Sequence, residues 1–424
     1  MTSLWRGMTN MAQTRDREVV IVKGQGVHLW DREGREYLDG TASLWYCNIG
    51  HGRTEMIDAV TAQMRKLEAF HTFDVYANEP ALALADRLSG LAPMADAKVF
   101  FTPGGGSDAV DTAAKLVRRY WALRGRPDKK VIVSRHHGYH GMNGYGTSIC
   151  GIPANVEGYN GALITDVHVV AADSVDAVEE LFASSADQIA AFVGEPVIGS
   201  GGVRPPRPDY WPRIAELCRQ YDVLLVSDEV ICAFGRLGSW FGCQAYGFEP
   251  DLITCAKGLT SGYLPLGAVI TSGHFAEPFW DSPDAPILRH GFTYGGHPTA
   301  CTAALANLDI IEREGLLERV VELSDWFARL LHDTFDGHAL TSEVRCAGLL
   351  AAVEMKPELL AVDPTLAVKV ATACREHGLI TRAIGASLQL SPPLVSTIEE
   401  IQSMVSRMAA ACDQMAATLQ PARV

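Results

Sequence analysis

The lysines of this sequence point to one position that could carry out chemistry. The chain has nine lysines, and Lys257 is the only one between Lys130 and Lys356. It follows the mostly apolar run Leu252-Ile-Thr-Cys-Ala, so we expect its amine near the end of a buried strand. An apolar environment lowers the pKa of a lysine and turns its amine into a nucleophile. Lys257 is therefore a candidate for covalent bonding to a carbonyl group, and the alternative is a lysine that reaches solvent from a strand end.

A carboxylate strengthens the case for Lys257. Asp228 follows the run Val223-Leu-Leu-Val-Ser, and burying a carboxylate is costly unless a cation lies near it. The interval from Asp228 to Lys257 has room for one crossover helix and one strand, so both side chains can reach one site. A lysine that bonds an aldehyde and an aspartate that pairs with a pyridinium nitrogen are what pyridoxal phosphate requires. A purely structural Asp–Lys ion pair is the alternative.

A glycine-rich loop suggests a phosphate site. Gly104-Gly105-Gly106-Ser107 follows an apolar strand and opens an amphipathic helix, whose free N–H groups attract anions. The loop also fits the dinucleotide pattern G-x-G-x-x-G/A. A dinucleotide site expects an acidic residue at the end of the next strand, but that strand ends in Arg135, which only an NADP site tolerates. The loop by itself does not decide between the two cofactors.

Apolar runs that alternate with helical segments must position these residues. Seven runs have the length of buried strands: 99–101, 131–133, 167–170, 190–193, 223–226, 252–254 and 266–270. Strand–helix alternation predicts an α/β fold with a mostly parallel sheet covered on both faces, and a ligand beyond the carboxyl ends of its strands. Helical segments at 299–335 and 397–418, with short strands between them, predict a smaller α+β domain.

Composition excludes several classes of protein. The chain is 48% hydrophobic, which excludes a disordered protein, and its net charge of −14 disfavours nucleic-acid and membrane-surface partners. The start of the sequence lacks the apolar stretch of a signal peptide, and no segment is apolar enough to span a bilayer. The ten cysteines form no C-x-x-C pair, so no metal site is indicated, and reduced thiols predict a cytoplasmic location.

The motifs, taken in order, resemble those of class III pyridoxal-phosphate aminotransferases, the omega-aminotransferase group of fold type I. The matching segments are Gly106-Ser-Asp-Ala109, Tyr139-His-Gly141, Gly194-Glu-Pro196, Asp228-Glu-Val230, Cys255-Ala-Lys-Gly258, His290-Gly-Phe-Thr-Tyr-Gly-Gly-His-Pro298, Gly378-Leu-Ile-Thr-Arg382 and Pro392-Pro-Leu394. The resemblance implies a large cofactor-binding domain at 49–305 with a mostly parallel seven-stranded sheet. It also implies a small domain at 306–424, with residues 1–48 packed beside it.

The resemblance implies pyridoxal 5′-phosphate as the cofactor and a role for each matching residue. Lys257 would bond the cofactor covalently and Asp228 would keep its ring nitrogen protonated, which makes them the catalytic pair. Tyr139 and Val230 would cover the two faces of the ring. The residues implied for the phosphate are Gly105, Gly106, Ser107 and, from the neighbouring subunit, Thr293.

Two further expectations follow from these roles. A site completed by Thr293 requires a homodimer, and the resemblance leaves open whether dimers pair into tetramers.

The chain departs from many relatives by having Gly104-Gly105 where they carry Asn-Ser. The departure removes a hydroxyl contact and bears on cofactor affinity rather than on the identity of the cofactor.

The resemblance also predicts a substrate pocket. Arg382 matches the mobile arginine that pairs with a substrate carboxylate, a task that suits a guanidinium. Trp45 matches the aromatic stretch of the amine pocket, Phe73 is a second aromatic candidate, and Glu195 is a third pocket residue. We expect transamination from an omega-amino acid or primary amine to a keto acid such as pyruvate.

Four other interpretations stay open. The same cofactor could serve an aminomutase or a transaminase dedicated to one biosynthetic intermediate. The Gly104 loop could belong to an NADP-dependent oxidoreductase. A non-catalytic vitamin B6-binding module is the fourth, and the retained Lys257–Asp228 pair counts against it because binding alone requires no base.

Overall fold

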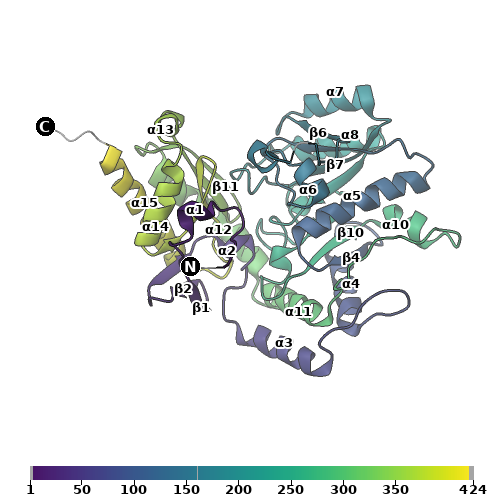
Figure 1. Ribbon diagram of the computed structural model, residues 1–424, viewed down its shortest axis with the longest axis horizontal. Coiled ribbons are helices and arrows are strands. Elements are labelled where there is room, and N and C mark those ends of the chain that lie inside the picture. The colour runs from purple at the N-terminus through teal and green to yellow at the C-terminus, as the bar shows by residue number, and fades with distance from the viewer. Residues whose placement is uncertain (1–2, 160, 420–424) are drawn as a thin grey trace.

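A seven-stranded sheet forms the centre of the larger part of the molecule (Figure 1). The computed structural model describes residues 3–159 and 161–419. The strand order is β4-β10-β9-β8-β7-β5-β6, and only β10 runs antiparallel to its neighbours. The strands are β4 (Lys98–Thr102), β5 (Val131–Arg135), β6 (Val167–Val170), β7 (Ile189–Gly194), β8 (Leu224–Asp228), β9 (Leu252–Cys255) and β10 (Gly267–Thr271). The mostly parallel sheet predicted from the seven apolar runs is confirmed, with one strand for each run.

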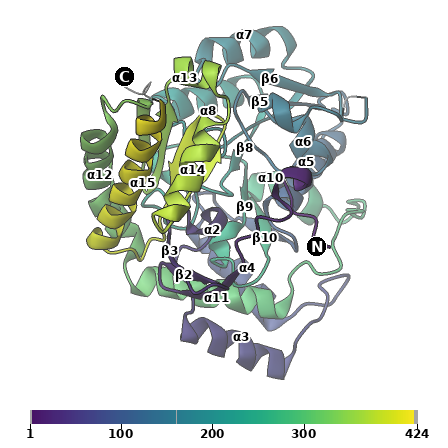
Figure 2. The same cartoon turned by 60° about the vertical axis from the view of Figure 1, so that its left-hand side comes forward.

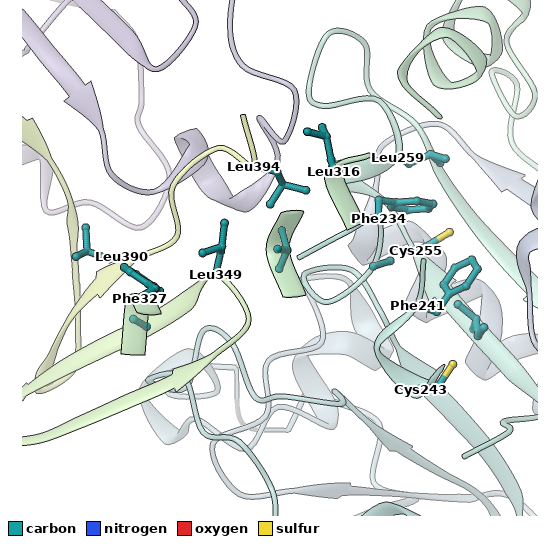
Figure 3. Packing of buried hydrophobic residues seen from close by; sticks show 14 of the residues in the cluster. Phe234, Phe241, Cys243, Cys255, Leu259, Leu316, Phe327, Leu349, Leu390 and Leu394 are labelled. Atoms are coloured by element: carbon teal, nitrogen blue, oxygen red, sulfur yellow. The ribbon is translucent and has the colours of Figure 1, made fainter. Parts of the chain in front are cut away.

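Alternate residues of these strands enter two different apolar clusters, which is why the runs are continuously hydrophobic. In β8, Leu225 joins one cluster while Val226 joins the other. The cluster of Val226 contains the buried side of α5 (Gly106–Leu123), and the cluster of Leu225 contains that of α8 (Tyr210–Gln220). Figure 3 shows part of the cluster that contains Leu225. In it the ring centroids of Phe234 and Phe241 lie 5.7 Å apart.

The remaining helices of the larger part are α3 (Thr54–Lys66), α4 (Glu79–Leu91), α6 (Gly144–Ser148), α7 (Val175–Ser185), α9 (Gly242–Ala245), α10 (Gly273–Trp280) and α11 (Pro298–Arg313). The short helix α2 (Ala42–Trp45) lies between the two parts, since Trp45 packs in one apolar cluster with Val197 and Leu350. Helix α11 packs against α3 and α4. Single 3-10 turns occur at Pro153–Asn155 and Lys257–Leu259.

The two ends of the chain build the smaller part together. Its main sheet has the order β11-β12-β15-β14, and a second sheet has the order β1-β2-β3-β13. The strands are β1 (Ile21–Gln25), β2 (His28–Asp31), β3 (Glu36–Asp39), β11 (Thr341–Ala347), β12 (Leu350–Met355), β13 (Leu379–Ile380), β14 (Arg382–Ile384) and β15 (Ser387–Leu390). Because β3 pairs with β13, the amino-terminal segment lies beside the carboxyl-terminal one, as Figure 2 shows. The domain boundaries themselves stay a prediction.

The helices of this smaller part are α12 (Leu316–Phe335), α13 (Pro357–Val362), α14 (Leu366–Glu376) and α15 (Ile398–Leu419), and α12 and α14 both pack against α15. The single-turn helix α1 (Met11–Thr14) near the amino terminus buries none of its residues. The helical segment expected at 299–335 is two helices, because Gly315 adopts a left-handed φ of +60° between α11 and α12. No helix among the described residues is long and apolar enough to cross a membrane.

Candidate active site

A cavity of ≈ 120 Å³ opens beyond the carboxyl ends of the parallel strands. Its wall comes from the segments that directly follow β4, β5, β7, β8 and β9. The lining residues are Gly106, Ser107, Val110, Tyr139, His140, Gly141, Glu195, Asp228, Val230, Ile231 and Lys257. Residues that are far apart in the sequence therefore meet at the edge where the strand–helix alternation predicts a ligand.

Lys257 is held in a strained and poorly solvated position. It begins the 3-10 turn after β9 with a left-handed φ of +47°, a conformation that a side chain with a Cβ rarely adopts. Burial lowers the pKa of its amine to about 8, although Asp228 and Glu195 act in the opposite direction. Nζ lies 5.3 Å from the ring centroid of Trp45. Near neutral pH the amine can therefore adopt both its protonated and its neutral form.

Asp228 is buried and fixed by three donors. Its Oδ1 accepts hydrogen bonds of 3.2 Å from Val230 N and from Thr254 Oγ1. His140 Nδ1 lies 2.7 Å from Oδ2, and because a carboxylate only accepts, that nitrogen carries the hydrogen. His140 Nε2 has no hydrogen-bond partner among the described residues. The carboxylate is therefore presented in one orientation beside the cavity.

Two of these three partners are not indicated by the sequence. We interpret His140 from the sequence as an ordinary hydrogen-bonded loop histidine, and the structure shows that its partner is Asp228. Thr254 pairs with Asp228 in the register of β8 and β9. A strand register could have identified Thr254, whereas no local pattern identifies His140.

Glu195 joins the cavity wall through its own backbone contacts. Its Oε1 accepts from Tyr139 N at 3.0 Å and its Oε2 accepts from Gly199 N at 2.9 Å. Burial raises the pKa of this carboxyl group, partly offset by His140 and by the two amide donors. Glu195 thereby fixes the loop that carries the Tyr139 ring.

The start of α5 forms a cradle with no room for side chains. Gly105 has a φ of +110°, and no side chain caps the helix. A Cβ on Gly106 would lie 2.7 Å from Val230 Cγ1, and one on Gly141 would lie 2.6 Å from Ser107 Oγ. The first N–H groups of the helix are therefore accessible to an anion. With a buried amine, a fixed carboxylate and the side chains of Tyr139 and Val230 lining the same cavity, this cradle fits pyridoxal phosphate.

Trp45 lies close to the Lys257 amine, and Arg382 lies close to Trp45. Trp45 is 5% exposed and has a φ of +61°. Asp39 holds this irregular segment, because its two oxygens lie 2.9 and 2.8 Å from Ser43 N. Arg382 begins β14, and its Cζ lies 5.6 Å from the same indole ring that faces Lys257. Both cationic groups therefore lie close to the same indole ring.

Phe73 and Thr293 do not line the cavity of their own chain. Phe73 is 46% exposed and Thr293 is exposed as well. Their loops touch each other, since Thr72 Oγ1 donates to Gly295 O at 3.0 Å. Seven of the other ten residues that the sequence singles out line the cavity. Gly105 directly precedes the lining residue Gly106, and Trp45 lies near Lys257 with Arg382 over its ring.

Comparison with known proteins gives consistent matches over almost the whole chain. The family model "Aminotransferase class-III" matches residues 10–412. A putrescine–pyruvate aminotransferase of Pseudomonas aeruginosa is 38% identical, with 94% of this chain and 91% of that protein covered. A crystal structure of an amine transaminase from an uncultivated Pseudomonas species, in its PLP-bound form, has a TM-score of 0.92 at 35% identity, covering 98% of this chain and 99% of that one. An (S)-enantioselective omega-transaminase of Thermomicrobium roseum also has a TM-score of 0.92, at 38% identity, covering 97% and 96%.

Proposed function

Because the chain belongs to the class III aminotransferases, we propose that it moves an amino group from an omega-amino acid or a primary amine to a keto acid such as pyruvate. Its cofactor is pyridoxal 5′-phosphate. One observation supports the choice of substrate: the Lys257 amine and the Arg382 guanidinium lie near the same indole, 5.3 and 5.6 Å from the centroid of the Trp45 ring. An aromatic wall beside the reactive amine suits an apolar amine, and a guanidinium near that wall suits a carboxylate.

The residues around the cavity divide into groups that would hold different parts of the cofactor. Gly105, Gly106 and Ser107 offer N–H groups at the start of α5 for a phosphate. Tyr139 and Val230 provide the two walls for a planar ring. Asp228, oriented by its three donors, is the acceptor for a protonated ring nitrogen.

Lys257 would both attach the cofactor and move the proton. When bound, pyridoxal phosphate supplies an aldehyde and an electron-withdrawing ring that stabilises negative charge on the substrate carbon. Because burial brings the pKa of Lys257 to about 8, its Nζ can accept a proton from that carbon and return it without a large energetic penalty. Glu195 keeps Tyr139 in place during these steps through its bond to the Tyr139 amide.

We extend the proposal to the assembly and the location of the enzyme. Thr293 is exposed and outside its own cavity, and it would reach the phosphate of a second copy in a homodimer. Phe73 shares that surface and would complete the substrate pocket across the same interface. All ten cysteines are free, and nine of them are buried, which supports a cytoplasmic location.

The test is a donor screen with pyruvate as the acceptor. Purified enzyme reconstituted with pyridoxal phosphate should form alanine from putrescine, beta-alanine or 1-phenylethylamine. Lys257→Ala should abolish the activity, with a loss of at least about 10⁴-fold, because it removes both the attachment point and the base. Lys356→Ala, which changes a lysine outside the cavity, should retain full activity. An enzyme that rearranges an amino aldehyde without any keto acid, and makes no alanine from these donors, would contradict the proposal.

A further inference from the structure

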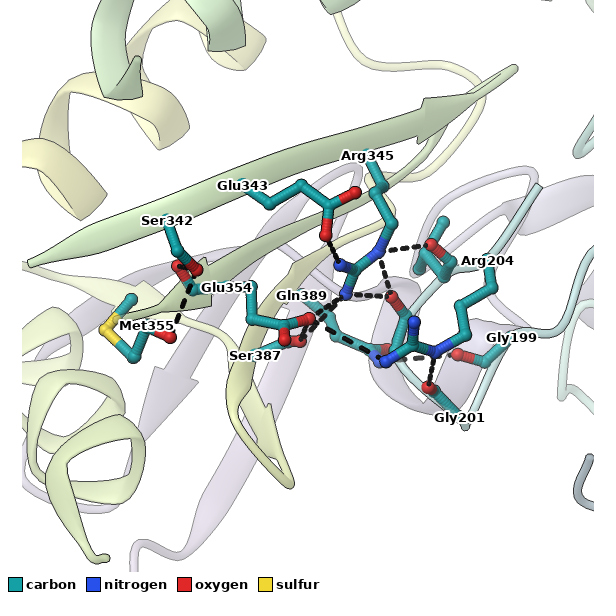
Figure 4. Close-up of polar contacts among 12 residues, drawn as sticks. Gly199, Gly201, Arg204, Ser342, Glu343, Arg345, Glu354, Met355, Ser387 and Gln389 are labelled. Carbon is teal, nitrogen blue, oxygen red and sulfur yellow. Dashed lines mark hydrogen bonds and ion pairs between the residues drawn. The ribbon is translucent and has the colours of Figure 1, made fainter. Parts of the chain in front are cut away.

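Gln389 on β15 carries a buried acceptor atom with no donor. Its side chain is fully buried, and its Oε1 has no hydrogen-bond partner among the described residues. The amide is oriented, because Nε2 donates to Gly199 O at 3.4 Å, as Figure 4 shows. A buried amide oxygen without a hydrogen-bond donor is unfavourable, so Oε1 is free to accept a hydrogen bond from a donor that moves close to it.

Arg382 is the cross-strand neighbour of Gln389. Strands β14 and β15 are antiparallel, and Arg382 lies directly opposite Gln389 in their register. Directly opposed residues present their side chains on the same face of a sheet. The residues that flank Gln389, Leu388 and Leu390, enter the apolar core on the other face. Gln389 and Arg382 therefore share the face that is turned toward Trp45.

The Arg382 guanidinium, in contrast, carries hydrogen-bond donors without an acceptor in the described part of the chain. It is half-buried over the Trp45 ring, and within residues 3–159 and 161–419 it has no hydrogen bond and no ion pair through its side chain. It has five N–H donors and no acceptor, while Gln389 Oε1 is an acceptor without a donor. A change of side-chain rotamer would satisfy both groups.

The backbone around Gln389 is held firmly enough to keep its amide in place. Arg345 of β11 donates through Nε to Gly202 O and to Val203 O, each at 3.0 Å (Figure 4). The same guanidinium forms an ion pair with Glu354 and donates to Ser387 Oγ at 3.2 Å. These contacts clamp the loop that contains Gly199 to the sheet that contains Gln389.

We propose that Gln389 is the resting partner of Arg382 and sets the preference of this enzyme between amino donors with a carboxylate and amines without one. The inference rests on the proposed function, in which Arg382 binds a substrate carboxylate. With a carboxylate-free amine in the pocket, Arg382 turns away and bonds to Gln389 Oε1. With a carboxylate present it leaves the neutral amide, because an ion pair with two hydrogen bonds is stronger than a bond to an uncharged oxygen.

Two donors of matched shape test this assignment. Alanine and isopropylamine differ only in a carboxylate or a methyl group beside the reacting carbon. Each is mixed with the holoenzyme without an acceptor, and the decay of the cofactor's visible absorbance gives kcat/KM for that half-reaction. The measured quantity is the ratio of kcat/KM for alanine to kcat/KM for isopropylamine. A general loss of stability lowers both values and does not change this ratio.

Variants of Gln389 should move this ratio in opposite directions. Gln389→Leu removes the acceptor for Arg382, so kcat/KM for isopropylamine should fall about tenfold. Because kcat/KM for alanine should change little, the ratio should rise. Gln389→Glu supplies an anionic partner that retains Arg382, so the ratio should fall by about tenfold or more. Gln63→Leu, a change of another buried glutamine on α3, should leave the ratio unaltered.

Arg382→Met separates this inference from the proposal on which it rests. If Arg382→Met leaves the ratio unchanged, Arg382 does not bind the substrate carboxylate, and both ideas are wrong. If Arg382→Met lowers the ratio but Gln389→Leu and Gln389→Glu stay within about twofold of the wild type, the role of Gln389 is wrong alone. Should Gln389→Glu fail to fold, Gln389→Leu and Gln389→Met still decide, because both remove the oxygen without adding charge.

Discussion

At the scale of single residues, two opposing effects, burial and nearby negative charge, set the pKa of the Lys257 amine. Burial disfavours the ammonium form, and the nearby Arg382 adds to this effect. Asp228 and Glu195 favour the ammonium form, but burial prevails and the pKa falls from 10.5 to about 8. A lysine whose pKa is lowered becomes a free amine as the pH rises through the lowered value.

The pH dependence of cofactor capture follows from this shift. Cofactor-free enzyme mixed with pyridoxal phosphate should bond it through Lys257 at a rate that increases with pH and is half-maximal near pH 8. Stopped-flow absorbance at several pH values measures this rate. Lys356→Ala provides the control and should give the same profile. A midpoint close to 10.5, the value for an ordinary lysine, would show that the amine is not desolvated.

At the scale of elements, the first turn of α5 depends on the absence of a side chain. Gly106 begins the helix, and a Cβ there would meet Val230 Cγ1 at 2.7 Å and Cγ2 at 2.9 Å. The valine cannot retreat easily, because the backbone N–H of Val230 is bonded to Asp228. A methyl group would therefore push the start of the helix away from the wall that faces it.

Gly106→Ala should weaken the binding of pyridoxal phosphate. Overpacking of this kind costs about 1–3 kcal/mol, so the dissociation constant should rise roughly tenfold or more. Titration of the cofactor-free enzyme, followed by visible absorbance, measures the constant. Gly90→Ala is the matched control, since Gly90 lies in α4 and a Cβ there has open space around it. If the two variants bind the cofactor equally well, the cradle has been assigned to the wrong residues.

At the scale of the whole molecule, one surface carries a group of exposed aromatic side chains that contact one another. Phe70, Phe73 and Tyr76 are 44, 46 and 53% exposed and contact one another through His71. The loop that carries Thr293 touches the same segment. Aromatic groups gathered in this way are typical of an interface core.

The proposed homodimer should therefore depend on this aromatic surface. Light scattering of the wild-type enzyme should give twice the chain mass of 45.9 kDa. Tyr76→Asp should shift the protein toward the monomer and reduce activity in parallel, because Thr293 would lose access to the second cavity. Val362→Asp, at an 85% exposed position on α13, should change neither property. A fully active wild-type monomer would contradict the shared site.

The sequence by itself was sufficient for the family, the fold and the cofactor. The seven apolar runs became the seven strands of the sheet, because continuous hydrophobicity reflects burial on both faces and is a local property of the chain. Lys257 and Asp228 could be recognised because each follows such a run directly, and the carboxyl ends of parallel strands meet at one edge. The predicted family, activity and cofactor are confirmed by the matches to class III aminotransferases.

Only the tertiary structure decided which side chains pair with one another. The contact of His140 with Asp228 joins residues separated by 88 positions, and the opposition of Gln389 to Arg382 depends on the register of two short strands. The pKa of Lys257 likewise depends on burial by distant segments. Composition and spacing report what a segment buries, but a hydrogen bond requires two atoms within about 3 Å, and that distance is set by the packing of the entire chain.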